Sequence, residues 1–181
     1  MLFWQANNDP LRGSACIACA CLIGIDRSTV GVALAQERTA TIGMGDRTRF
    51  QVGALAATSL VDGSCDAAMS LDVLLFVPDQ AAPLREVARI LRADGLFALT
   101  SWEQSGYSAR LGALQVADYR PLLDAAGFVA EVYEEPPDWQ RHQRALVEGI
   151  IAAEMELADE FGMAAAARYL AMARGAGALN P

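Results

Sequence analysis

The feature that most constrains the fold is a regular alternation of short apolar segments with amphipathic ones. Leu22–Asp26 has the composition of a buried strand, and Ser28 offers an N-cap hydroxyl to a helix over STVGVALAQERTA that ends near Gly43. A second strand is predicted at Thr48–Val52. Strands that alternate with helices of this length indicate βαβ units. The predicted class is therefore α/β, with a mainly parallel sheet and helices on both faces.

The next segments continue this alternation. A strand is predicted over CDAAMSLDVLLFV, and the turn RADG leads into another over LFALTSW. A helix from about Val116 to Ala126 stops at Gly127, which has the position of a C-cap, and FVAEVYEE predicts a further strand. Between the first two of these strands, Asp79 caps a helix whose apolar positions share one face, namely Leu84, Val87, Ala88 and Leu91.

The last part of the sequence has a helical pattern. Pro136 and Pro137 suit a helix start. The length of 181 residues is most simply one domain over residues 1–181, with 1–20 as an atypical N-terminal segment and 136–177 as a C-terminal helical region. An apolar stripe in that region is expected to pack on the sheet or on a partner, and its members are Trp139, Gln143, Leu146, Ile150, Ala153 and Leu157, widened by Val147 and Ile151.

The charge balance limits the kinds of partner and compartment. The net charge is -8 and no basic run occurs, which argues against nucleic acid or an anionic membrane surface. The apolar run Ala15–Ile25 after Arg12 is too short to span a bilayer. The run resembles a signal-peptide core, but no A-x-A-like cleavage site precedes Asp26. Cytoplasmic residence is the expectation, and secretion is the alternative.

The four cysteines are candidates for a metal or redox site. Cys16, Cys19 and Cys21 stand together in CIACAC, so a zinc site would need two more ligands from outside this cluster. Only Cys65 and His142 remain for that purpose, and His142 lies in the charged stretch DWQRHQR, where we expect it to be solvated. Apolar surroundings raise the pKa of a thiol. We therefore interpret the cysteines as buried small apolar residues, with no metal site, and a redox or metal role as the alternative.

Asp26 is the first candidate for a binding residue. In parallel sheets ligands bind beyond the carboxyl ends of the strands, and Asp26 stands at one of those ends. A carboxylate there can accept hydrogen bonds from both hydroxyls of a ribose. It can equally cap a turn or the helix that starts beside it. The residue alone does not decide between these roles.

Three stretches of sequence extend this observation. They are LIGIDRS, then RFQVGALAATSLVDGSCDAAMSLDVLLFVPD, and then LREVARILRADGLFALTSWE. From roughly Cys21 to Glu134 the chain resembles the class I S-adenosylmethionine-dependent methyltransferases of small-molecule type. VGALAATSLVDGSCDAAMS and LREVARILRADGLF are the most specific parts, although the family commonly has Pro-Gly in the turn where this chain has Ala93, Asp94 and Gly95.

The resemblance implies a Rossmann-like methyltransferase sheet of seven strands with S-adenosylmethionine lying across the strand ends. It implies that Asp26 binds the ribose hydroxyls and that Arg27 lies beside the adenine. It further implies that Ala54 and Leu55 line the adenine pocket.

The same resemblance places other residues on the substrate side. Ser70, Leu71 and Asp72 would face the methionine part of the donor and the substrate. Trp102 and Tyr107 follow the strand after which the family usually builds its substrate pocket. Methyl transfer needs a general base only when the acceptor must lose a proton, and no residue identifies itself as that base. Asp72 is a weak candidate, because it also suits a strand-end cap.

The sequence departs from the family in three places, so the fold is expected to be incomplete at both ends. The G-x-G-x-G loop after the first strand is missing, and Gly13 is the sole glycine in MLFWQANNDPLRGSACIACAC. Ala54 stands where the family commonly has an acid that binds the adenine amino group. No strand pattern follows the C-terminal helical region.

The first departure has a consequence for the sheet, because the family's first strand is central. Its loss would leave a gap that LFWQ, the cysteine run or another chain must fill, since unpaired strand edges inside a sheet are costly. We expect either a rearranged N-terminus or strand-level association into a homo-oligomer.

Two classes of function follow from the resemblance. The first is methyl transfer from S-adenosylmethionine to a small-molecule acceptor. The second is a non-catalytic methyltransferase-like binding protein, or a truncated remnant, which the missing loop and Ala54 favour. A nicotinamide-dependent dehydrogenase shares the ribose-binding acid, but it would need G-x-G-x-x-G before Leu22, and that motif is absent.

Overall fold

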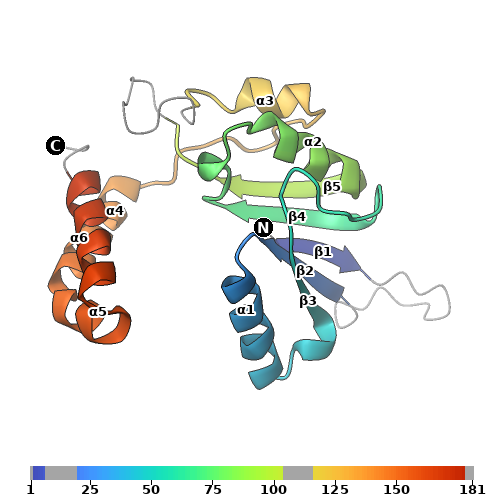
Figure 1. Ribbon diagram of the computed structural model, residues 1–181. Coiled ribbons are helices and arrows are strands. Elements are labelled where there is room, and N and C mark those ends of the chain that lie inside the picture. The colour runs from blue at the N-terminus through green and yellow to red at the C-terminus, as the bar shows by residue number, and fades with distance from the viewer. Residues whose placement is uncertain (1, 7–19, 104–115, 178–181) are drawn as a thin grey trace. The chain divides into compact units, whose positions relative to one another are not determined.

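The computed structural model describes residues 2–6, 20–103 and 116–177 (Figure 1). They fall into two compact units, Met1–Ala130 and Glu131–Pro181, and each unit is described by itself. The single domain expected over residues 1–181 stays a prediction.

The first unit contains a five-stranded sheet in the order β3-β2-β1-β4-β5. β2 pairs parallel with β3, and β4 pairs parallel with β5, so the expected α/β fold with a mainly parallel sheet is confirmed. The strands are β1 (Leu2–Ala6), β2 (Ala20–Asp26), β3 (Thr48–Val52), β4 (Cys65–Leu71) and β5 (Leu91–Thr100).

β1 fills the centre of the sheet, and it runs antiparallel to both of its neighbours. Leu2 pairs with Gly24 of β2 and with Met69 of β4. The segment LFWQA therefore occupies the gap expected between β2 and β4, which corresponds to a rearranged N-terminal segment. Because the chain itself supplies the central strand, the sheet does not need a strand from a second copy.

Helices cover both faces of this sheet. α1 (Thr29–Thr41) connects β2 to β3, and α2 (Ala81–Ile90) connects β4 to β5 (Figure 1). The two crossovers run in opposite directions along the sheet, and right-handed crossovers then place their helices on opposite faces. The main core lies between α2 and the sheet and consists of Ile23, Ile25, Cys65, Ala68, Val87, Ile90 and Leu91.

The local signals around these helices are confirmed. The Ser28 hydroxyl accepts a hydrogen bond from the Gly31 amide at 2.9 Å, as an N-cap does. Asp79 Oδ1 accepts from the Ala81 and Ala82 amides in the first turn of α2, at 3.1 and 3.2 Å. Gly127 follows α3 (Arg120–Ala125) with φ +89°, the left-handed conformation of a C-cap glycine.

Three predicted element boundaries are wrong. β5 begins at Leu91, so Leu91 does not share the apolar face of α2, and the stretch RADG, predicted as a turn, lies within the strand. β4 ends at Leu71, because Asp72 has φ +50° and the 3₁₀ turn η3 (Leu74–Phe76) follows. α3 begins at Arg120 rather than Val116, since Pro121 occupies its first turn. A proline inside a helix would remove a backbone donor and clash with the preceding turn, so the helix does not extend back through it.

The strand predicted over FVAEVYEE does not form. The residues from Val129 to Glu135 are exposed and belong to no strand, and Val129 is 88% exposed. A strand needs a neighbouring strand to receive its backbone hydrogen bonds. In the part of the chain that the structure describes, no strand follows β5, so this apolar alternation has no neighbour to pair with.

The pairing of β4 with β5 contains an irregularity that depends on Gly95. The register shifts between Cys65 and Ala67, opposite the stretch from Arg92 to Gly95. A Cβ atom at Gly95 would lie 2.9 Å from the Arg92 carbonyl oxygen and 3.2 Å from that of Asp66.

We therefore expect Gly95→Ala to lower the free energy of unfolding by about 1–3 kcal/mol, the usual cost of overpacking against a rigid backbone. Urea unfolding followed by circular dichroism measures this change. Gly45→Ala is the matched control, because its Cβ would meet nothing closer than Ala40 Cα at 3.7 Å. Equal stability of the two variants would contradict the close contact at Gly95.

The second unit is helical, as predicted. It contains α4 (Trp139–Ala152), α5 (Glu154–Phe161) and α6 (Met163–Gly177). Most of the predicted stripe is half-buried within this unit, but Leu146 is 63% exposed. None of the helices in the described ranges is long and apolar enough to cross a membrane.

Candidate functional site

The candidate site lies at the carboxyl edge of the sheet, where the two crossovers diverge. Such a switch point opens a crevice in parallel sheets, and ligands bind there. Asp26 ends β2 and Leu71 ends β4, each two residues beyond the partner of Leu2 in the ladder. The two residues therefore stand at the same level on either side of β1, about 10 Å apart at the usual strand spacing.

Asp26 has both a structural bond and an open acceptor. Its Oδ1 accepts from the Ser28 amide at 2.8 Å, and its main-chain oxygen accepts from the Gly53 amide at 2.9 Å. Among the described residues Oδ2 has no partner, and the side chain is exposed. The turn bond thus fixes the orientation of the carboxylate and leaves one oxygen available to a ligand. Arg27 is exposed next to it.

Ala54 and Leu55 form a tight turn directly after β3. The Ala57 amide donates to the Ala54 carbonyl at 3.1 Å, and these two residues form an isolated bridge. Ala54 is exposed, whereas Leu55 is 8% exposed. β3 lies beside β2, with Asp26 paired to Val52, so this turn lies next to Asp26 at the same edge of the sheet.

The end of β4 presents two side chains in opposite directions. Ser70 is fully buried, and its hydroxyl has no hydrogen-bond partner among the described residues. Leu71 is 57% exposed. Asp72 caps the neighbouring strand, because its amide donates to the Thr100 carbonyl at 3.0 Å and its Oδ1 accepts from the Thr100 hydroxyl at 3.1 Å. Its geometry therefore matches the strand-end cap considered from the sequence.

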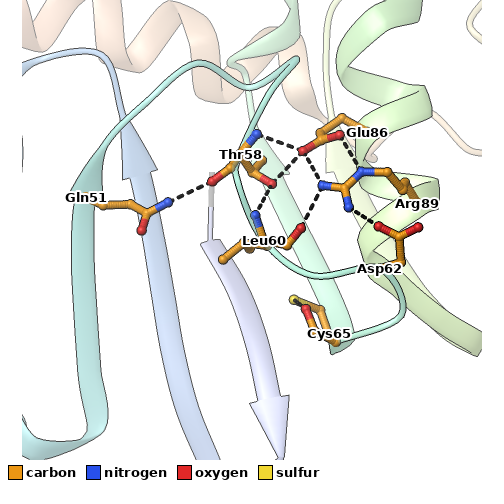
Figure 2. A network of polar contacts seen from close by, with 8 residues as sticks. Gln51, Thr58, Leu60, Asp62, Cys65, Glu86 and Arg89 are labelled. Atoms are coloured by element: carbon orange, nitrogen blue, oxygen red, sulfur yellow. Dashed lines mark hydrogen bonds and ion pairs between the residues drawn. The ribbon is translucent and has the colours of Figure 1, made fainter.

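The loop between β3 and β4 is fastened to α2 by a buried carboxylate (Figure 2). Glu86 Oε1 accepts from the Thr58 amide at 2.7 Å and from the Thr58 hydroxyl at 2.6 Å. Arg89 donates to both oxygens of Glu86, at 2.7 and 2.8 Å, and to the Leu60 carbonyl at 2.8 Å. It also forms an ion pair with Asp62.

These contacts stabilise the ionised form of Glu86. The hydrogen bond from Arg89 lowers the pKa of the Glu86 carboxyl from 4.5 to about 2, and the bonds from Thr58 act in the same direction against the effect of burial. Sequence analysis missed this network. The spacing of Glu86 and Arg89 on the helix is compatible with an ion pair, but nothing in the sequence identifies Thr58, 28 residues away, as the third partner.

Beyond β5 a second polar cluster surrounds the buried Tyr119. The Ser101 hydroxyl donates to the Tyr119 hydroxyl at 2.7 Å, and the Tyr119 amide donates to Glu103 Oε1 at 2.8 Å. Burial raises the pKa of the Tyr119 phenol. Trp102 is 40% exposed at this end of the strand. Tyr107, the other predicted pocket aromatic, lies outside the described residues.

The cysteine and histidine candidates do not join this site in the described residues. Cys65 is a buried free thiol in the core, and burial raises its pKa. Cys21 is free and half-buried, and Cys16 and Cys19 lie outside the described ranges. His142 is exposed in the second unit. No group of three or more His, Cys, Asp or Glu side chains that could hold a metal ion occurs among the described residues.

Comparisons with known proteins agree with this architecture. Residues 11–99 match the family described as methyltransferase domain. The chain is similar to the (4+2)-cyclase SpnF, with 25% identity and a TM-score of 0.67, over 84% of this chain and 61% of that protein. It also has the fold of phosphoethanolamine N-methyltransferase 2 from Haemonchus contortus, solved with S-adenosylhomocysteine, with 18% identity and a TM-score of 0.69, over 84% of this chain and 39% of that one. The chain therefore spans less than two thirds of either protein's length.

Proposed function

We propose, from the premise that residues 11–99 belong to the class I S-adenosylmethionine-dependent methyltransferase family, that this chain transfers a methyl group from S-adenosylmethionine to a small-molecule acceptor. One observation carries the proposal. Asp26, the Ala54–Leu55 turn and Leu71 stand together at the carboxyl edge of the sheet, at its switch point.

The residues at this edge fit the nucleoside part of the donor. Asp26 Oδ2 is an open acceptor on a carboxylate that the Ser28 amide already orients, which suits a ribose hydroxyl. Leu55 and Ala54 offer an apolar wall to an adenine, with Arg27 exposed nearby. Ser70 contributes the one buried hydroxyl without a described partner, next to Leu71, where the methionine part would lie.

Methyl transfer makes limited demands on the protein. S-adenosylmethionine, when bound, supplies an activated methyl group. The chain's own residues then hold the donor and the acceptor in line and exclude water, which is the main source of acceleration for such a displacement. A general base is needed only for an acceptor that must lose a proton. The net charge of -8 favours a neutral or cationic small molecule over an anionic polymer as the acceptor.

The orientation of β1 supports a second candidate, a methyltransferase-like protein that binds a ligand without methyl transfer. Because β1 is antiparallel, the chain leaves Ala6 at the edge opposite to Asp26, where Ala6 pairs with Ala20. The described end of β1 therefore lies away from the carboxyl edge, whereas the family's first strand ends at that edge. That a protein of this fold is named as a (4+2)-cyclase supports the view that the fold also serves other chemistry.

The proposal is tested by calorimetric titration of S-adenosylhomocysteine into the wild type, Asp26→Ala and Asp26→Asn. We expect Asp26→Ala to weaken binding by about 1–3 kcal/mol, the cost of leaving a ribose hydroxyl unpaired. Asp26→Asn keeps an oxygen for the Ser28 amide, so it should preserve the turn and still bind more weakly than the wild type.

The matched control is Asp46→Ala, an exposed carboxylate in the 3₁₀ turn η2 (Gly45–Arg47) that precedes β3, at the other edge of the sheet. Its affinity should equal that of the wild type. Wild-type affinity in Asp26→Asn would show that the aspartate acts only through its turn.

A further inference from the structure

The connection from β3 to β4 passes across the sheet without a helix, and its shape depends on α2. This connection, residues 53–64, begins with the Ala54–Leu55 turn and then runs along α2 to the start of β4. Thr58 lies midway and is 1% exposed, so its backbone groups are shielded from water. Buried backbone donors and acceptors must find partners within the protein. Here α2 and β3 supply them.

Every polar group of Thr58 is engaged. Its amide and its hydroxyl both donate to Glu86 Oε1 (Figure 2). Its hydroxyl oxygen accepts a hydrogen bond from the Leu60 amide at 3.2 Å, and its carbonyl accepts one from Gln51 Nε2 at 2.9 Å. Gln51 belongs to β3 and Glu86 to α2, so Thr58 is held from both sides. Only Ala56 and Ala57 separate it from Leu55.

We propose that Glu86 is a positioning residue for the candidate site, because it holds Thr58 and thereby fixes the Ala54–Leu55 turn in the form that receives the nucleoside part of the ligand. This inference rests on the proposed function. Glu86 itself does not touch the ligand in this account, and Arg89 holds the Glu86 carboxylate in place while it also binds the Leu60 carbonyl and Asp62.

A carboxylate is the side chain that this arrangement requires. Glu86 Oε1 accepts three donors, from the Thr58 amide, the Thr58 hydroxyl and Arg89, while Oε2 accepts a fourth from Arg89. An ionised carboxyl group has acceptors and no donor, so it suits a position that only donors face. Glutamine would turn an NH₂ group toward one of these donors and lose at least one bond.

Four variants test the inference. Thr58→Val removes the hydroxyl and keeps the amide bond, and Glu86→Gln removes the charge and one acceptor. Thr58→Ser restores the hydroxyl. Asp66→Asn is the matched control, because it weakens another ion pair of this unit, Arg92 with Asp66 at 2.7 Å, at the opposite edge of the sheet. The readouts are the affinity for S-adenosylhomocysteine and the amide hydrogen exchange of residues 53–58 in the ligand-free protein.

We expect Thr58→Val and Glu86→Gln to weaken binding about tenfold and to speed exchange in residues 53–58 by a similar factor, which corresponds to the loss of one or two hydrogen bonds. Thr58→Ser should restore both values. Asp66→Asn should lower stability without changing either. This contrast separates positioning from a general loss of folding, which would move all the destabilised variants alike.

The possible results distinguish a failure of this inference from a failure of the proposed function. Wild-type affinity in both Thr58→Val and Glu86→Gln, with a wild type that binds, would reject the positioning role alone. A wild type that does not bind would reject the proposed function. In that case unchanged exchange in the two variants would also reject the positioning of the turn, and faster exchange would support it.

Discussion

Replacing Glu86 by alanine is expected to lower the free energy of unfolding of the first unit by about 3 kcal/mol. The change removes four hydrogen bonds to a charged group and leaves the Thr58 amide and hydroxyl buried without an acceptor. An unsatisfied buried donor costs about 1–3 kcal/mol, and bonds to a charged partner contribute about 1.5–3 kcal/mol each before compensation. Arg89 retains Asp62 and the Leu60 carbonyl, which limits the loss.

Urea unfolding followed by far-ultraviolet circular dichroism measures this effect. Glu37→Ala is the control, because Glu37 is exposed on the helix α1 and its side chain makes no described contact. Such surface substitutions usually stay within about 0.5 kcal/mol. A loss in Glu86→Ala no larger than that in Glu37→Ala would contradict the role of the buried carboxylate.

Acid should destabilise the protein through the same residue. The pKa of Glu86 is 4.5 in its ordinary state and about 2 in the fold, where Arg89 stabilises the charged form. A lowered folded pKa means that the contribution is complete above about pH 5 and is lost as the pH falls toward 2, because the unfolded carboxyl binds a proton first. The difference between these two pKa values corresponds to about 3 kcal/mol of unfolding free energy.

A comparison with Glu86→Gln isolates this contribution, because glutamine does not titrate. The difference in unfolding free energy between the wild type and Glu86→Gln should be largest near neutral pH and shrink steadily as the pH falls from 5 to 2. Two curves that stay parallel over this interval would show that the ionisation of Glu86 is not linked to folding.

Much of the local structure could be predicted from the sequence, because its signals act over short distances. The Ser28 hydroxyl caps a helix three residues away, and Gly127 adopts the positive φ that a C-cap requires. β3 matches the predicted Thr48–Val52. The apolar pattern of Leu22–Asp26 also placed Asp26 at a strand end, which is where the structure has it.

The rest depended on pairing between distant segments, which no local pattern encodes. The composition of LFWQA suits a strand but does not set the direction of that strand, so its antiparallel pairing with β2 and β4 could not be predicted. FVAEVYEE has the alternation of a strand but no described neighbour to pair with. Glu86 and Arg89 are three residues apart on one helix, yet Thr58, the other partner of Glu86, comes from the connection before β4.

These non-local features define what is unusual about the candidate site. The carboxyl edge carries Asp26, the Ala54–Leu55 turn and the end of β4, while the antiparallel β1 ends with Ala6 at the other edge. The connection between β3 and β4, which Glu86 holds, contributes the Ala54–Leu55 turn to this carboxyl edge. Under the proposed function, ligand binding depends on the shape of this connection as well as on the contacts of Asp26.

The central claim is that a methyl donor binds across the carboxyl edge of this sheet, and amide chemical-shift mapping tests it most directly. S-adenosylhomocysteine is titrated into ¹⁵N-labelled protein of 19.3 kDa. The account predicts saturable shifts at Asp26, Ala54, Leu55, Ser70 and Leu71, at micromolar to submillimolar ligand, with no shifts at the opposite edge around Asp46 and Asp66. The absence of shifts up to millimolar ligand, or shifts confined to the second unit, would contradict the claim.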